Sequence, residues 1–181
     1  MMNLIMSLFK MFSSVSKVAK QAESSKPKIV APTVFITLQD WITSSGRYPE
    51  RAKSAELTEE VKANAEDLIK RVNNLLNIVG WTEKVTISSG FRPSGVNANV
   101  AGAAKRSAHM IGKAMDIQQP KASNKLGLLI RKIQDNKGKA GILGQSGLMM
   151  EALESTIGQN TAWAHLDTVV RTERPSMEFK P

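Results

Sequence analysis

Residues 107–116 read Ser-Ala-His-Met-Ile-Gly-Lys-Ala-Met-Asp and combine a tight bend with the start of a strand. Gly112 permits a sharp turn after His109, because glycine adopts backbone angles that other residues rarely adopt. Residues 114–117 are predicted to form a strand in which Asp116 faces away from its two apolar neighbours, since successive side chains alternate between the faces. The stretch therefore directs an imidazole and a carboxylate toward one site.

The chain has only two histidines, and the second, His165, lies in the sequence Trp163-Ala-His-Leu-Asp167. Catalytic zinc sites take three protein ligands from imidazole and carboxylate groups and leave a fourth position for water. The three side chains His109, Asp116 and His165 can supply such a set. They are therefore candidate ligands of one Zn²⁺ ion, although a single His or Asp in a strand is more often a hydrogen-bonded structural residue.

Apolar periodicity divides the rest of the chain into helices and short strands. A long helix is expected after Thr58, a plausible N-cap, because apolar residues recur at three- and four-residue steps until Val79, before Gly80. We also expect a loop over 94–104, a helix over 126–133, and strands around 85–87, over 114–117, over 148–151 and over 163–168. This mixture predicts an α+β domain with a small, mostly antiparallel sheet and helices packed on one side of it.

Composition narrows the classes of protein and partner. The chain has 181 residues, no cysteine and a net charge of +9. The missing cysteines exclude disulfide scaffolds, iron–sulfur clusters and cysteine nucleophiles. No stretch reaches the roughly 18 apolar residues of a membrane-spanning helix. The positive charge favours an anionic partner such as a cell envelope. Nucleic acid is not expected, because the chain lacks a basic block with interleaved aromatic residues.

Residues 1–32 are predicted to be an amphipathic, basic arm and a linker, followed by one domain over 33–181. Apolar residues of the arm follow helical spacing, and five lysines against one acid make residues 1–30 basic. A secretory signal fits poorly, because no Lys or Arg precedes Lys10. We expect the arm to pack on the domain, on a partner or on an anionic surface.

The sequence resembles those of a known family. The motif of Ser107, His109, Gly112, Ala114 and Asp116, with His165 after Trp163, is similar to that of zinc peptidases that include D-alanyl-D-alanine carboxypeptidases and the L-alanyl-D-glutamate endopeptidases of phage endolysins. A phage-borne branch is more similar still, through the stretches at 88–93, 97–98, 148–151 and 174–181. The resemblance covers about residues 35–181 and implies a fold like that of hedgehog and D-Ala-D-Ala peptidases.

The resemblance also implies roles for single residues. Zinc would be held by His109, Asp116 and His165. Arg92 resembles the arginine that binds the substrate carbonyl or the developing oxyanion. Ser107 would bind the substrate or orient His109.

The general base is less clearly indicated. Many family members carry an acid three residues before the last histidine, where this chain has Ala162. Glu151 is a candidate base if its strand pairs with that of His165. Asp167 shares a strand face with His165 and would be either the base or the group that orients the imidazole. Glu154 is a weaker candidate.

The implied function is hydrolysis of peptidoglycan stem peptides by a phage-encoded enzyme. It would act in the periplasm or cell wall during lysis, or be carried in the virion for wall penetration, with residues 1–25 contacting other virion proteins. The alternative is a structural or assembly protein of the virion that retains the peptidase fold. The sequence leaves open whether the enzyme is a carboxypeptidase or an endopeptidase.

Overall fold

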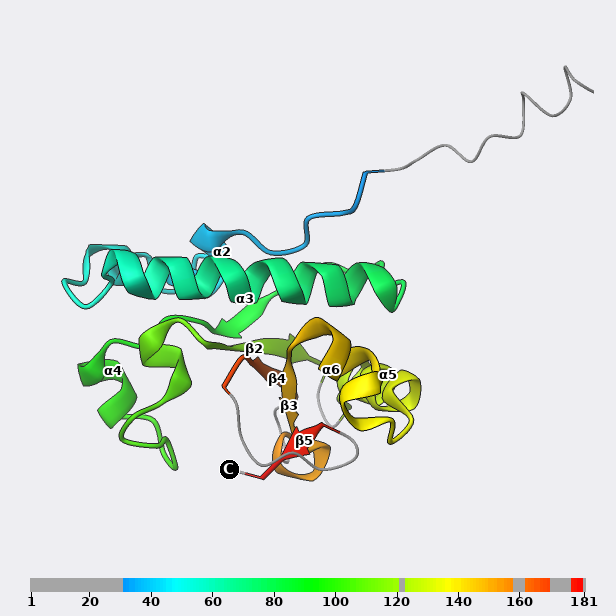
Figure 1. The fold of residues 1–181 in the computed structure, drawn as a ribbon. Coiled ribbons are helices and arrows are strands. Elements are labelled where there is room, and N and C mark those ends of the chain that lie inside the picture. The colour runs from blue at the N-terminus through cyan, green and yellow to red at the C-terminus, as the bar shows by residue number, and fades with distance from the viewer. Residues whose placement is uncertain (1–30, 121–122, 158–161, 170–176, 181) are drawn as a thin grey trace, which may run out of the picture. The chain divides into compact units, whose positions relative to one another are not determined.

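The computed structural model describes residues 31–120, 123–157, 162–169 and 177–180 (Figure 1). Its helices are α2 (Leu38–Thr43), η1 (Pro49–Lys53), α3 (Glu59–Ile78), α4 (Ser94–Ala98), η2 (Ala108–Ile111), α5 (Lys125–Gln134), η3 (Gly138–Ala140), α6 (Ile142–Ser146) and η4 (Leu153–Ser155). Its strands are β1 (Ile87–Ser89), β2 (Ala114–Gln119), β3 (Met149–Glu151), β4 (Ala162–Asp167) and β5 (Glu178–Phe179). Residues 1–30 of the predicted arm and linker (1–32) lie outside the described residues. Within the described ranges, no helix combines the length and apolar character needed to cross a bilayer.

The strands form one sheet in the order β1-β2-β4-β3-β5. All neighbouring pairs are antiparallel except β3 and β5, which run parallel. In the central pair, Asp116 of β2 lies opposite His165 of β4. The prediction of an α+β fold with a small, mostly antiparallel sheet is confirmed.

The long helix α3 covers the apolar face of the sheet (Figure 1). Thr58 caps it by accepting a hydrogen bond from the backbone N–H of Val61, and glutamates in the first turn suit the helix dipole. Alternate residues of the strands belong to the buried hydrophobic core, among them Ile87, Met115, Ile117, Ala164 and Leu166. The opposite face of β2 and β4 carries Asp116 and His165, so the sheet separates the core from the polar site.

Several short elements differ from the sequence predictions. The expected loop over 94–104 begins with the helix α4, and α2, α6 and β5 were not predicted. Each of these four spans six residues or fewer, which is too short for a periodic apolar signal. Local contacts stabilise α2 instead, because Thr37 and Asp40 form a reciprocal capping box.

Gly112 joins the His109 turn to the core. Its φ of +79° lies in the left-handed region, and a Cβ built on it would overlap the carbonyl oxygen of Val61 in α3. Next to it, Asn64 of α3 donates to the carbonyl of Ile111 over 3.0 Å. The backbone that carries His109 therefore lies directly against α3.

We expect Gly112→Ala to destabilise the protein more than Gly102→Ala. Gly102 has a similar φ of +73° but open space around it, so its substitution adds only the left-handed strain, about 1–2 kcal/mol. Gly112→Ala adds overpacking against α3, about 1–3 kcal/mol more. Chemical denaturation measures both free energies of unfolding. If both variants lose the same free energy of unfolding, Gly112 does not pack closely against α3.

Candidate metal centre

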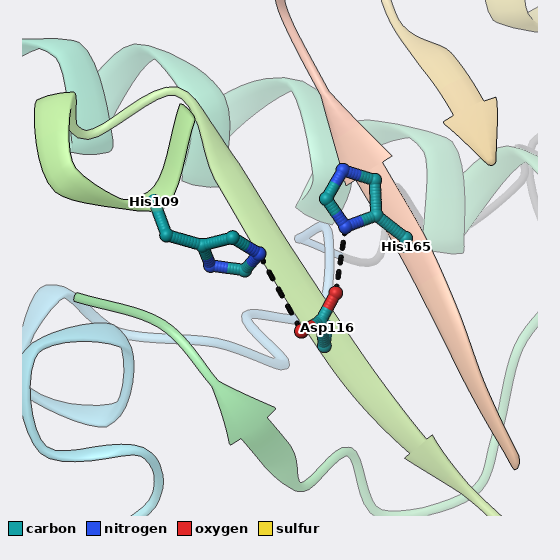
Figure 2. A group of neighbouring side chains, drawn as sticks. All are labelled: His109, Asp116 and His165. Carbon is teal, nitrogen blue, oxygen red and sulfur yellow. Dashed lines mark hydrogen bonds and ion pairs between the residues drawn. The ribbon is translucent and has the colours of Figure 1, made fainter. Parts of the chain in front are cut away.

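Three side chains from separate elements meet on the polar face of the sheet. His109 comes from η2, Asp116 from β2 and His165 from β4 (Figure 2). One ligand atom from each lies within 4.8 Å of the other two, and all three residues are buried. The structure thus brings together the three residues that the sequence singled out as a ligand set.

Asp116 is the centre of this group. Its Oδ1 lies 2.7 Å from Nδ1 of His165, and its Oδ2 accepts from Nη2 of Arg92 at 2.8 Å. The same Oδ2 lies 3.4 Å from Nε2 of His109. Burial alone would raise the pKa of Asp116, but the interactions with His109 and then His165 outweigh it and hold the pKa well below its usual range. The carboxyl group is therefore ionised.

His109 is oriented by a backbone carbonyl. Its Nδ1 lies 2.9 Å from the carbonyl oxygen of Gly90, which can only accept, so Nδ1 carries the proton and Nε2 a lone pair. Burial lowers the pKa of His109 and keeps the ring neutral. Nε2 is buried and has no hydrogen-bond partner among the described residues. An unpartnered imidazole nitrogen facing a carboxylate is the donor arrangement that a divalent metal ion requires.

Gly90 holds this carbonyl in place through close packing. A Cβ at this position would overlap the carbonyl oxygen of Trp41, and the next residue, Phe91, donates its backbone N–H to that oxygen at 3.0 Å. The sequence could not reveal this carbonyl as a site group, because a backbone acceptor leaves no residue-type signal.

His165 is held between two carboxylates. Its Nε2 lies 3.1 Å from Oδ2 of Asp167, and Oδ1 of Asp167 accepts from the backbone N–H of Val169 at 3.0 Å. Burial would lower the pKa of His165, but hydrogen bonds with Asp116 and then Asp167 raise it to about 9. Without a metal the ring is therefore protonated, and Nδ1 is the atom that faces Asp116.

Arg92 and Ser107 both lie beside the group. Nε of Arg92 donates to Oγ of Ser89 at 2.7 Å while Nη2 donates to Asp116, so the guanidinium is anchored on the carboxylate. Ser107 is the N-cap of η2, and its Oγ accepts from the backbone N–H of His109 at 3.4 Å. This contact places Ser107 behind the histidine turn.

The two remaining candidate acids lie in different surroundings. Glu151 ends β3, and continuing the register of Met149 with Asp167 and Met150 with Leu166 places it opposite His165. Burial raises the pKa of Glu151. The charge of His165 and a hydrogen bond with Trp163 oppose this rise, and the charges of Asp116 and Asp167 add to it.

Glu154, in contrast, is exposed and pairs with Arg131. That guanidinium also binds the buried Glu178. Of the two acids, only Glu151 is therefore coupled to the metal-binding group.

The ring of Phe179 is a further neighbour that sequence reasoning did not place at the site. It meets the His165 ring edge-on, with centroids 5.7 Å apart, and lies opposite Glu151 in the parallel pair of β3 and β5. A two-residue strand gives no alternation pattern, so only the assembled sheet reveals this apolar wall.

Metal uptake is expected to release a proton from His165. Since the pKa of His165 stands at about 9, Nδ1 is protonated at neutral pH and must lose its proton to bind a metal. Affinity for Zn²⁺ should therefore fall about tenfold for each pH unit below about 9. Calorimetric titration of the metal-free protein in buffers of different ionisation enthalpy counts the protons.

Asp167→Asn is the matched variant for this titration. It removes one charge that raises the pKa of His165, so fewer protons should be released and the pH dependence should be shallower. Zinc binding by the wild type at neutral pH without proton release would show that His165 is not protonated in the metal-free protein.

Comparison with known proteins agrees with this geometry. The family model for Peptidase M15 matches residues 50–150, more than half of the chain. The match includes His109 and Asp116 and ends before His165. No match to a curated protein was found. With its buried His-Asp-His group able to hold a metal ion, the chain belongs to the Peptidase M15 family of metallopeptidases.

Proposed function

We propose that the protein is a zinc-dependent peptidase that hydrolyses peptide bonds in bacterial peptidoglycan stem peptides. The observation that carries this proposal is the buried, unpartnered Nε2 of His109, which faces Asp116 beside His165. Two imidazoles and one carboxylate match the ligands of catalytic zinc sites. Membership of the Peptidase M15 family supports the same chemistry.

In this proposal the metal is held by Nε2 of His109, a carboxylate oxygen of Asp116 and Nδ1 of His165. A zinc ion bound there would supply the Lewis acidity that polarises a peptide carbonyl and acidifies water. The carbonyl of Gly90 and the carboxylate of Asp167 fix the two rings through their other nitrogens. Such contacts select the ligating tautomer and keep the imidazoles in place.

We assign the general base to Glu151. Its carboxylate accepts a proton from the attacking water and passes that proton to the leaving amine. A raised pKa suits this exchange, because a base works best when its pKa approaches the working pH. Asp167 is less suited to this role, because its two oxygens are engaged by His165 and by the backbone of Val169.

Arg92 is proposed to stabilise the charge that develops on the substrate carbonyl oxygen. Nε and Nη2 are engaged by Ser89 and Asp116, which fixes the plane of the guanidinium. This leaves Nη1 to donate to the substrate. Ser107 is proposed to act mainly by shaping the turn that carries His109.

The net charge of +9 supports a site of action at an anionic cell envelope. We propose a phage-encoded enzyme that acts in the periplasm or cell wall, or from the virion, with residues 1–25 as the element that binds virion proteins or the envelope. These assignments rest on the resemblance described from the sequence and on the charge of the chain.

His165→Ala tests the metal-dependent activity directly. We expect the purified wild type to contain one zinc ion per chain and to digest purified peptidoglycan, and both properties to be lost in the variant or after chelation. Metal analysis and zymography measure them. A well-folded wild-type protein without zinc and without hydrolysis would instead favour the virion structural protein.

Glu151→Gln is expected to keep the metal and lose turnover. Removing a general base lowers kcat by about 10²–10⁴-fold, while the amide preserves the size of the side chain. Rates on purified muropeptides and zinc content are measured together.

Glu154→Gln is the control, since Glu154 is exposed and pairs with Arg131, and its kcat should stay within about twofold of the wild type. Full activity of Glu151→Gln would exclude Glu151 as the base.

A further inference from the structure

The polar face of the sheet extends beyond the metal-binding group. Gln118 follows Asp116 by two residues on β2, and Trp163 precedes His165 by two residues on β4. Gln118 and Trp163 lie opposite each other in the register. Since side chains alternate, both project from the face that carries Asp116 and His165. The row next to the metal centre is therefore an exposed amide beside a half-buried indole.

Arg47 reaches this row from outside the sheet. It lies in the turn over residues 44–47 that follows α2. In this turn, Oγ of Ser45 accepts a hydrogen bond from the backbone N–H of Ile87 at 2.8 Å, which ties the turn to β1. Nη2 of Arg47 donates to Oε1 of Gln118 at 3.2 Å. Arg47 is exposed and forms no ion pair within the described part of the chain, whereas Arg71, Arg92 and Arg131 each pair with a carboxylate there.

The contact between the two side chains leaves donors available to a ligand. Because Oε1 of Gln118 accepts from Arg47, its Nε2 is the group free to donate, and the guanidinium keeps further N–H groups. An arginine and an amide side by side match a carboxylate, which accepts from several donors at once.

We propose that Arg47 and Gln118 form a subsite that binds a carboxylate of the peptide substrate. The inference rests on the proposed function and adds the anionic group that the substrate must carry. Trp163 lies opposite Gln118 on β4, two residues before His165, and so borders both the subsite and the metal centre.

The strand spacing limits where this carboxylate lies in the substrate. Two residues along β2 span about 6.6–6.8 Å, and an extended peptide advances about 3.3–3.6 Å per residue. The carboxylate should therefore lie one or two residues from the cleaved bond. In a stem peptide the terminal carboxylate and the free α-carboxylate of the D-glutamyl residue are groups of this kind.

Two pairs of synthetic stem peptides distinguish these sources. One pair carries the D-glutamyl α-carboxylate or its carboxamide, and the other carries a free or an amidated C-terminus. For one pair, we expect the wild type to show a KM about tenfold or more lower for the carboxylate peptide, with kcat nearly unchanged. In Arg47→Gln that ratio of KM values should fall to about one, and Arg47→Lys should retain part of it.

Lys53→Gln is the matched control, because it removes the same charge from the nearby helix η1, where Lys53 is exposed. It should preserve the carboxylate preference. A wild type that cleaves both members of each pair with equal KM would overturn the subsite, as would an Arg47→Gln variant that keeps the preference. Cleavage of no peptide by the zinc-loaded wild type would overturn the proposed function itself, and the subsite with it.

Discussion

The pairing of Asp116 with His165 is the interaction on which the rest of the site depends. An ionised carboxylate in a buried position costs several kcal/mol unless charged or hydrogen-bonding partners surround it. Asp116 has two such partners from different parts of the chain, His165 of β4 and Arg92 of the segment after β1. A shift of β4 by one residue would turn His165 toward the core and leave the carboxylate without its hydrogen-bond partner on β4. The register of β2 and β4 therefore determines the geometry of the site.

The core face of the sheet keeps that register. Met115, Ile117, Ala164 and Leu166 pack against α3 from the same two strands that carry the polar residues on their other face. Moving either strand would therefore open the core as well as the site. His109 lies in η2 and is not held by strand pairing. The close contact of Gly112 with α3 fixes the position of this turn instead. Ligands fixed in this way are preorganised, so binding a metal requires little rearrangement.

Sequence reasoning found the parts of this arrangement that have a local signal. The long helix was predicted from its cap and its apolar period, and β2 and β4 from their alternation and polar residues. The roles of Glu151 and Asp167 could not be separated, because they depend on which acid hydrogen-bonds the His165 ring after the strands pair. The carbonyl of Gly90 and the ring of Phe179 were likewise invisible, since their positions arise from packing between distant segments. The arm and linker over residues 1–32 stay a prediction from sequence alone.

The position of Glu151 follows from the geometry of β4. Residues 163, 165 and 167 share the polar face, so the residue three places before His165 projects to the other side. Ala162 occupies that place, where it is buried and lies opposite the buried Gln119. A carboxylate there would point into the core and could not reach the metal-binding group. An acid can instead lie close to His165 if it is opposite this histidine on a neighbouring strand, because such cross-strand pairs hold their Cβ atoms about 4.5–5.5 Å apart. β3 supplies Glu151 at that place, so the chain keeps an acid beside the histidine while its own strand β4 carries a small apolar residue.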